Sequence, residues 1–233
     1  MSADPALDLD ADVRRYDEDR WLASRFAPAP VRKRLVVLYA LNHEIARTSA
    51  VVTQEAIGDI RLAWWRDAIA EVHAGKPPRA HPVLTAYAEV APFVDAKTWT
   101  GVIEARSEAD FSAAPFAGWV EADAYVERTV RGVMELAAGV CGAGGPPPLM
   151  RAAGRAWGFA NLLSTRPAKL PDVEEARRRV HAALEEARRI VFESALFPAI
   201  GYAALAPMYV RKAAPSLLGR QLKLIAASAT GRL

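Results

Sequence analysis

Apolar residues recur along most of the chain at steps of three or four positions, which is the period of a helix that buries one face. The first such segment opens after Pro30 and, with one longer gap, carries Leu35, Leu38, Leu41, Ile45 and Val52. The same period predicts further helices over about 54–74, 82–91, 95–112, 121–141, 149–164, 173–191, 196–212 and 216–229. Stretches that alternate apolar with polar residues are essentially missing, so no sheet is expected.

Proline and glycine mark where these helices end. Gly75 and Pro77-Pro78 follow the second segment, and the run from Gly142 to Pro148 separates two later ones. The connections are short, and no internal repeat or low-complexity linker is present. We therefore predict an all-α protein, with a single domain of about eight or nine helices over residues 17–233. Residues 1–16 are expected to be disordered or loosely attached.

The amino-acid composition of the chain excludes several kinds of site and partner. A single cysteine, Cys141, excludes an internal disulfide framework and a multi-cysteine zinc site. The four histidines lie on different segments with no paired metal spacing. The formal net charge is +3, and the basic clusters are interleaved with acids and accompany no nucleic-acid motif. No nucleic-acid partner is therefore expected.

Two features of the sequence bear on where in the cell the protein is found. The stretch from Met1 to Asp12 holds four aspartates and no basic side chain, unlike a secretory or transit peptide. The longest charge-free run, 194–210, is shorter than the roughly 20 residues of a spanning helix. We expect a cytoplasmic protein. Basic residues follow this apolar run, which suits either peripheral contact with an anionic membrane or, more simply, a buried bundle helix.

Acidic pairs are the candidate metal ligands. Two carboxylates four positions apart share one helix face and can hold magnesium, which prefers oxygen ligands. Glu55 with Asp59 has this spacing, but acids in a first helical turn are favoured by the helix dipole anyway. The second pair is Glu104 with Glu108, followed by Asp110. These three form the candidate magnesium site, and a solvated helix face is the competing interpretation.

Four segments stand in a recognisable order along the chain. They are DRWLASRFAP from Asp19, LYALNHEI from Leu38, RLAWWR from Arg61 and GRAWGFANLL from Gly154, the last followed by Leu170-Pro171. Together they resemble the squalene/phytoene synthase family, from about residue 17 to the end of the sequence. The resemblance implies an all-α isoprenoid-synthase fold with a central cavity.

The resemblance also implies a chemistry. Family enzymes join two prenyl diphosphates head to head, and two aspartate-rich motifs hold the magnesium ions that stabilise the leaving pyrophosphate. In the first motif His43 stands where an arginine is expected, and Ala46, Arg47 and Ala50 stand where aspartates are expected. In the second, Asn161 matches, whereas the departures are Gly158, Ser164, Thr165, Ala168 and Lys169. No resident metal or other cofactor is therefore expected.

This pattern resembles a non-catalytic branch of the family, the relatives of a mitochondrial respiratory complex I assembly factor. The resemblance implies binding of a prenyl lipid, a prenyl diphosphate or a respiratory-complex subunit. Arg47 and Lys169 would bind a diphosphate in place of magnesium. The residues expected to line the cavity are Tyr39, Asn42, His43, Arg47, Arg61, Trp64, Asn161 and Lys169, with packing in the helical core as the competing interpretation.

Two other classes stay open. One is an active prenyl diphosphate-dependent transferase whose magnesium is held by relocated acids, namely Glu44, Glu104, Glu108 and Asp110. The other is an interaction scaffold whose cavity is filled by its own side chains, since the chain has six tryptophans. An open apolar tunnel would favour ligand binding, and packed tryptophans would favour the scaffold.

Overall fold

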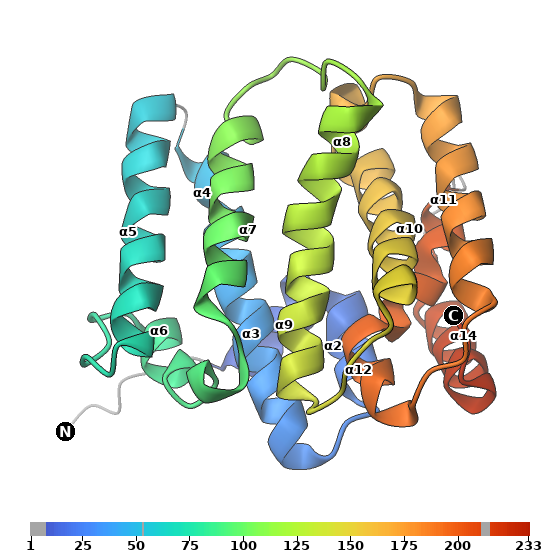
Figure 1. The fold of residues 1–233 in the computed structure, drawn as a ribbon, viewed down its shortest axis with the longest axis horizontal. Helices are drawn as coiled ribbons and strands as arrows, with labels where there is room; N and C mark the ends of the chain where they lie inside the picture. Colours follow the sequence, from blue (N-terminus) through green and yellow to red (C-terminus); the bar gives the residue numbers. More distant parts are fainter. Residues whose placement is uncertain (1–7, 53, 211–214) are drawn as a thin grey trace.

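The computed structural model describes residues 8–52, 54–210 and 215–233, and their regular structure is helical, with no strand (Figure 1). The prediction of an all-α fold is confirmed, with more helices than the eight or nine expected. The α-helices are α1 (Leu9–Tyr16), α2 (Glu18–Ser24), α3 (Ala29–Ala46), α4 (Thr48–Val51), α5 (Glu55–His73), α6 (Pro82–Tyr87), α7 (Ala96–Ala109), α8 (Trp119–Val126), α9 (Gly132–Val140), α10 (Pro147–Thr165), α11 (Val173–Arg188), α12 (Phe197–Ile200), α13 (Ala206–Val210) and α14 (Leu217–Thr230).

The long helices begin and end where the sequence places its capping residues. Asp95 precedes α7 and its carboxylate accepts hydrogen bonds from the amides of Lys97 and Thr98. Asp172 caps α11 in the same way, through the amide of Glu175. Helix α14 ends at Gly231, whose positive φ of 61° is a left-handed conformation that glycine adopts without strain.

The segment predicted as one helix over 196–212 is broken into short pieces. Helices α12 and α13 alternate with 3-10 turns at Ser194–Leu196 and Gly201–Leu205. Pro198 lies in the first turn of α12, and the residues from Ala199 to Leu205 are almost fully buried on every side. This segment therefore has no solvent face that would impose a single helical stripe. Residues 211 and 212 lie outside the described residues.

The N-terminal residues differ from the expectation of a disordered segment. Residues 9–16 form α1, which packs against α3 and buries Val13. On the outer side Asp10 accepts hydrogen bonds from the indole of Trp21 at 3.0 Å and the guanidinium of Arg25 at 2.6 Å. Residues 1–7 lie outside the described residues. The expectation of a loosely attached segment therefore does not hold for residues 9–16.

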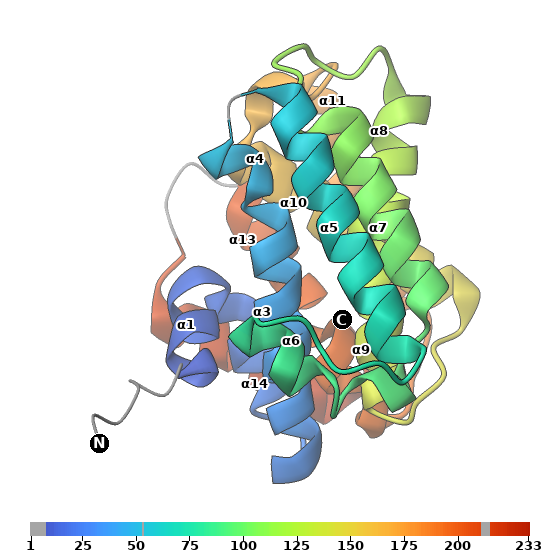
Figure 2. The same ribbon diagram turned by 90° about the vertical axis from the view of Figure 1, so that its left-hand side faces the viewer.

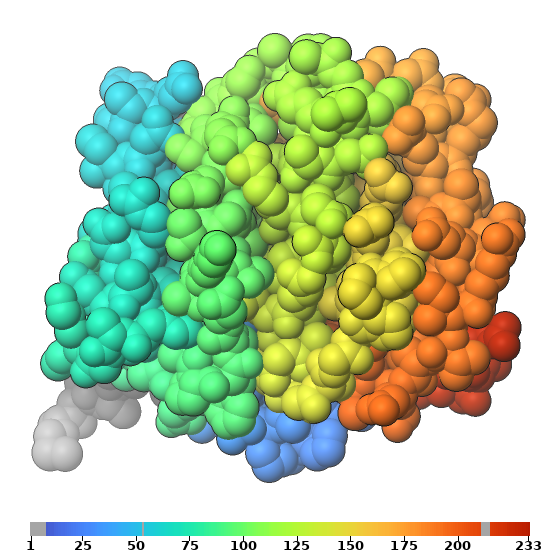
Figure 3. Space-filling view, in the orientation of Figure 1, coloured from blue at the N-terminus to red at the C-terminus, as the bar shows by residue number. Residues whose placement is uncertain are grey.

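The long helices stand side by side across one face in the order α5, α7, α8 with α9, α10 and α11 (Figures 1 and 3). Helix α3 lies behind them (Figure 2), and its contacts with α9 close the core between the layers. Helices α8 and α9 form one continuous rod through a π-helical turn at Glu127–Arg131. This turn packs against both α7 and α10, so that the centre of the rod contacts both neighbours.

Cys141 follows α9 directly and is partly exposed. Burial of its thiol raises the pKa to about 12. Among the described helices, none is both long and apolar enough to cross a membrane.

Candidate functional site

A cleft of about 340 Å³ opens between α3, the end of α7, the α8–α9 rod and α10. Its walls include three small residues, Ala46 at the end of α3, Ala50 on α4 and Gly158 on α10. Gly158 is required by packing, because an added Cβ would lie 2.4 Å from Val126 of α8. The polar lining includes Asp17, Arg20, Asn42, His43, Arg106, Asp110, Tyr125, Asn161 and Arg166.

Three of the residues predicted to line a cavity meet here, namely Asn42, His43 and Asn161. Asn42 is 5% exposed, and its Oδ1 atom has no hydrogen-bond partner among the described residues. The ring of His43 stacks on Tyr16 of α1 at a centroid distance of 4.6 Å. Burial lowers the pKa of His43, which favours the neutral imidazole. The cleft thus presents neutral polar groups from α3 and α10.

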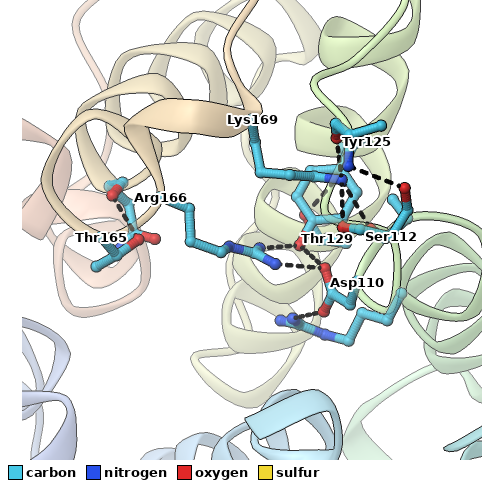
Figure 4. A network of polar contacts seen from close by, with 11 residues as sticks. Asp110, Ser112, Tyr125, Thr129, Thr165, Arg166 and Lys169 are labelled. Carbon is cyan, nitrogen blue, oxygen red and sulfur yellow. Dashed lines mark hydrogen bonds and ion pairs between the residues drawn. The ribbon is translucent and has the colours of Figure 1, made fainter. Parts of the chain in front are cut away.

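Asp110 is the centre of a buried ionic network (Figure 4). One carboxylate oxygen accepts from Arg166 Nη1 at 2.8 Å and from the Tyr125 hydroxyl at 2.7 Å. The other accepts from Arg106 Nη1 at 3.1 Å. Burial alone would raise the pKa of Asp110, but Arg106 and Arg166 outweigh it and lower the pKa below its usual value. Asp110 is therefore an ion held by two arginines and a tyrosine.

A second arginine–aspartate pair lines the same cleft. Arg20 is almost fully buried, and its Nη1 atom bonds Asp17 at 2.7 Å. Its guanidinium lies 4.9 Å from the ring centre of Tyr202 and 5.7 Å from that of Tyr39. The carboxylates lining the described cleft, Asp17 and Asp110, are thus both paired with arginine.

Residue spacing contains a signal for part of this network that the sequence analysis did not use. Arg106 and Asp110 are four positions apart, which places them on one helix face. Arg20 stands inside the first family-like segment, DRWLASRFAP. Arg166 and Tyr125 have no comparable local signal, because they reach Asp110 from other helices.

Three other predicted residues lie in a separate groove. Arg47, Arg61 and Trp64 line a depression of about 490 Å³ between the end of α3, α4 and α5. Arg47 pairs with Glu44 at 3.2 Å rather than pointing into the central cleft. The edge of Trp64 packs against Trp65, with ring centroids 4.9 Å apart. The predicted cavity set is therefore divided between two sites.

The last two predicted residues line neither site. Tyr39 is fully buried in the core, and its hydroxyl donates to the carbonyl of Pro198 at 3.4 Å. Lys169 is 8% exposed and its ammonium donates to three backbone carbonyls, those of Ala109 at 3.0 Å, Ser112 at 3.1 Å and Ala114 at 2.9 Å (Figure 4). Lys169 therefore holds the segment that follows α7 and has no donor left for a diphosphate.

The acids considered as magnesium ligands are not assembled into a site. Glu104 is exposed, Glu108 pairs with Arg128, and Asp110 belongs to the network described above. Within residues 8–52, 54–210 and 215–233, no three histidine, cysteine or acidic side chains lie close enough to hold a metal together. Both carboxylate oxygens of Asp110 already accept hydrogen bonds from cations or a hydroxyl. The residues of the cleft therefore do not fit magnesium.

Known structures define the class of this fold. The crystal structure of squalene synthase HpnC from Alicyclobacillus acidocaldarius superimposes with a TM-score of 0.67, over 96% of this chain and 92% of that one, at 17% sequence identity. A dehydrosqualene synthase crystallised with a ligand superimposes with a TM-score of 0.69, over 95% of this chain and 94% of that one, at 12% identity. The helices thus form an isoprenoid-synthase fold.

The family follows from the sequence match. The squalene/phytoene synthase profile matches residues 13–189, and the chain belongs to this family. Over 130 residues, 56% of the chain, it is 23% identical to NADH dehydrogenase (ubiquinone) complex I, assembly factor 6, of Homo sapiens and 25% identical to that of Rattus norvegicus. The match spans 39% of the length of each of these relatives.

Proposed function

We propose that this chain does not condense prenyl diphosphates and acts instead as a binding factor in the assembly of a respiratory complex. The observation that carries the first part is the state of Asp110, whose two oxygens are used by Arg106, Arg166 and Tyr125. From the end of α3 into α4, the positions where the family resemblance implies carboxylates are occupied by Ala46, Arg47 and Ala50. A prenyl diphosphate would therefore meet no free carboxylate pair to bring magnesium to its leaving group.

The charge of the cleft supports a ligand of a particular kind. Three arginines line it, Arg20, Arg106 and Arg166, against two aspartates, Asp17 and Asp110. The charged side chains of the lining therefore sum to one positive charge. Of the two arginines that pair with Asp110, Arg166 is the more exposed, at 35%. A prenyl lipid with an anionic head group would suit this lining without a metal, through charge-assisted hydrogen bonds. A segment of a protein partner could bind the same arginines through an acidic side chain.

The first test measures turnover. Purified protein is incubated with farnesyl or geranylgeranyl diphosphate and magnesium, and pyrophosphate release is measured beside the squalene synthase of Alicyclobacillus acidocaldarius. We expect release from that enzyme and none from this chain above a control without protein. Release by this chain would overturn the proposal in favour of an active transferase. Loss of that release in Asp110→Asn would then assign the reaction to the central cleft.

The second test addresses assembly, which the two curated relatives suggest through their names. In cells that make this protein, deletion of its gene is expected to lower the amount of assembled NADH dehydrogenase on native gels. Reintroducing the intact chain should restore it, while the amount of another respiratory complex stays unchanged as the control. An unchanged amount of NADH dehydrogenase after deletion would contradict this part of the proposal.

A further inference from the structure

Helix α14 presents an apolar stripe to solvent. Leu218, Leu222 and Ile225 are 64%, 58% and 56% exposed, and their spacing of four and three places them on one face. Leu217, the residue before Leu218, is 41% exposed. Surface helices ordinarily turn their polar residues outward. This face of α14 is therefore the reverse of what water alone would favour.

The fold does not depend on the stripe, because the opposite face of α14 makes the contacts. Leu224 and Ala227 are buried there, and the helix packs on the 3-10 turn at Gly201–Leu205 and on α2. Arg220 points inward and pairs with Glu18 and with Asp19, the latter at 2.8 Å. Helix α14 is thus fixed at the edge of the molecule, beside the lower end of α11 (Figure 1).

The sequence around the stripe is basic. From Ser194 to Leu233 the sequence contains no acidic residue and five basic ones, Arg211, Lys212, Arg220, Lys223 and Arg232. Arg188 of α11 joins this group, since its Nε atom donates to the carbonyl of Leu233 at 2.9 Å and its own carbonyl accepts from Arg232 at 3.4 Å. It also lies close enough to Lys223 to lower the pKa of that lysine, after the larger effect of burial.

Among the described residues Arg188, Lys223 and Arg232 form no salt bridge. Arg220 does, because it pairs with Glu18 and Asp19. An apolar stripe beside unpaired cations is the pattern of a helix that lies in the interface of an anionic bilayer.

We propose that α14 docks this protein on an anionic membrane surface, with Leu218, Leu222 and Ile225 in the boundary of the acyl chains. Lys223, Arg188 and Arg232 would reach the lipid phosphates, the lysine by extending its flexible stem. Charge complementarity selects this occupant over a second copy of the chain. A symmetric pairing through α14 would bring like cations face to face, which costs free energy. The proposal goes beyond the central cleft and does not depend on what the cleft binds.

Vesicle flotation tests the proposal with the full chain. We expect the protein to float with vesicles of phosphatidylcholine and phosphatidylglycerol, to float much less with phosphatidylcholine alone, and to be released by salt. The double variant Leu222→Ser/Ile225→Ser should lower the bound-to-free ratio by about tenfold or more. The matched control is Val120→Ser on α8, which removes a side chain that is 87% exposed on another helix and should leave binding unchanged.

Circular dichroism confirms that each variant is folded, and light scattering after gel filtration reports the oligomeric state. Absence of flotation with anionic vesicles would overturn the proposal, as would equal flotation of the double variant and the wild type. A dimer that the double variant dissociates, with no vesicle binding, would assign the stripe to a second copy instead. Because no variant touches the cleft, failure here leaves the pyrophosphate and assembly tests unaffected.

Discussion

Replacing Asp110 with alanine is expected to lower the free energy of unfolding by about 3 kcal/mol. The carboxylate is 3% exposed and compensates Arg106, which is 11% exposed, and Arg166. Without it Arg106 stays charged in a largely dry site, while Arg166, 35% exposed, regains part of its hydration. Urea denaturation of the purified variant measures the loss. The Tyr125 hydroxyl also loses its acceptor, which adds to the cost.

The matched control is Glu108→Gln in the last turn of α7, two positions before Asp110. Glu108 is 58% exposed and its pair with Arg128 lies at the surface, so a change below about 1 kcal/mol is expected. Equal effects of the two substitutions would show that Asp110 is not the centre of a buried network.

The pH dependence of stability follows from the same carboxylate. Its pKa is lower in the folded chain than in the unfolded chain, so its contribution is fully present above the unfolded value, about 4. As the pH falls from there through the folded pKa, the carboxylate takes up a proton and the contribution is lost. Asp110→Asn should therefore show a shallower loss of stability below about pH 4 than the wild type.

Replacing Lys169 with methionine is expected to cost about 2–3 kcal/mol, because hydrogen bonds from a charged donor to buried carbonyls contribute more than neutral ones. Three carbonyls between Ala109 and Ala114 would lose their donor. Amide hydrogen exchange should accelerate in that segment and in Phe116, whose amide donates to the carbonyl of Lys169 at 2.9 Å. Urea denaturation gives the size of the loss.

Lys97→Met on α7 provides the control, since Lys97 is exposed and its replacement should stay within about 0.5 kcal/mol. A Lys169→Met variant as stable as the wild type, with unchanged exchange between residues 109 and 116, would contradict the structural role and restore a ligand-binding one.

The periodicity of the sequence was sufficient for long helices such as α7 and α11, because each buries one stripe and begins after a capping aspartate. It was insufficient where burial is not one-sided. The residues from Ala199 to Leu205 face protein on all sides, so no stripe distinguishes one helix from several short ones. Helix α2 was missed because charged residues on it, Asp19 and Arg20, are buried, against the usual preference of charge for water.

The candidate site was only partly predictable for a physical reason. Asn42 and Asn161 lie on helix faces that the family-like segments fix, and both line the cleft. Arg47 is one position after Ala46, and this single step turns it about 100° around the helix into the other groove. Lys169 has a long side chain whose direction depends on acceptors in a distant segment. Sequence spacing gives the face of a helix but not the partner of a flexible cation.

The thiol of Cys141 makes this protein convenient for spectroscopy. With a pKa of about 12, it is almost entirely protonated at neutral pH, and only thiolates react readily with maleimides. A cysteine introduced at an exposed position such as Ala226, with a pKa near the ordinary value of about 8.5, would have a much larger thiolate fraction. An environment-sensitive fluorophore would therefore attach at one chosen position while the native cysteine stays in place.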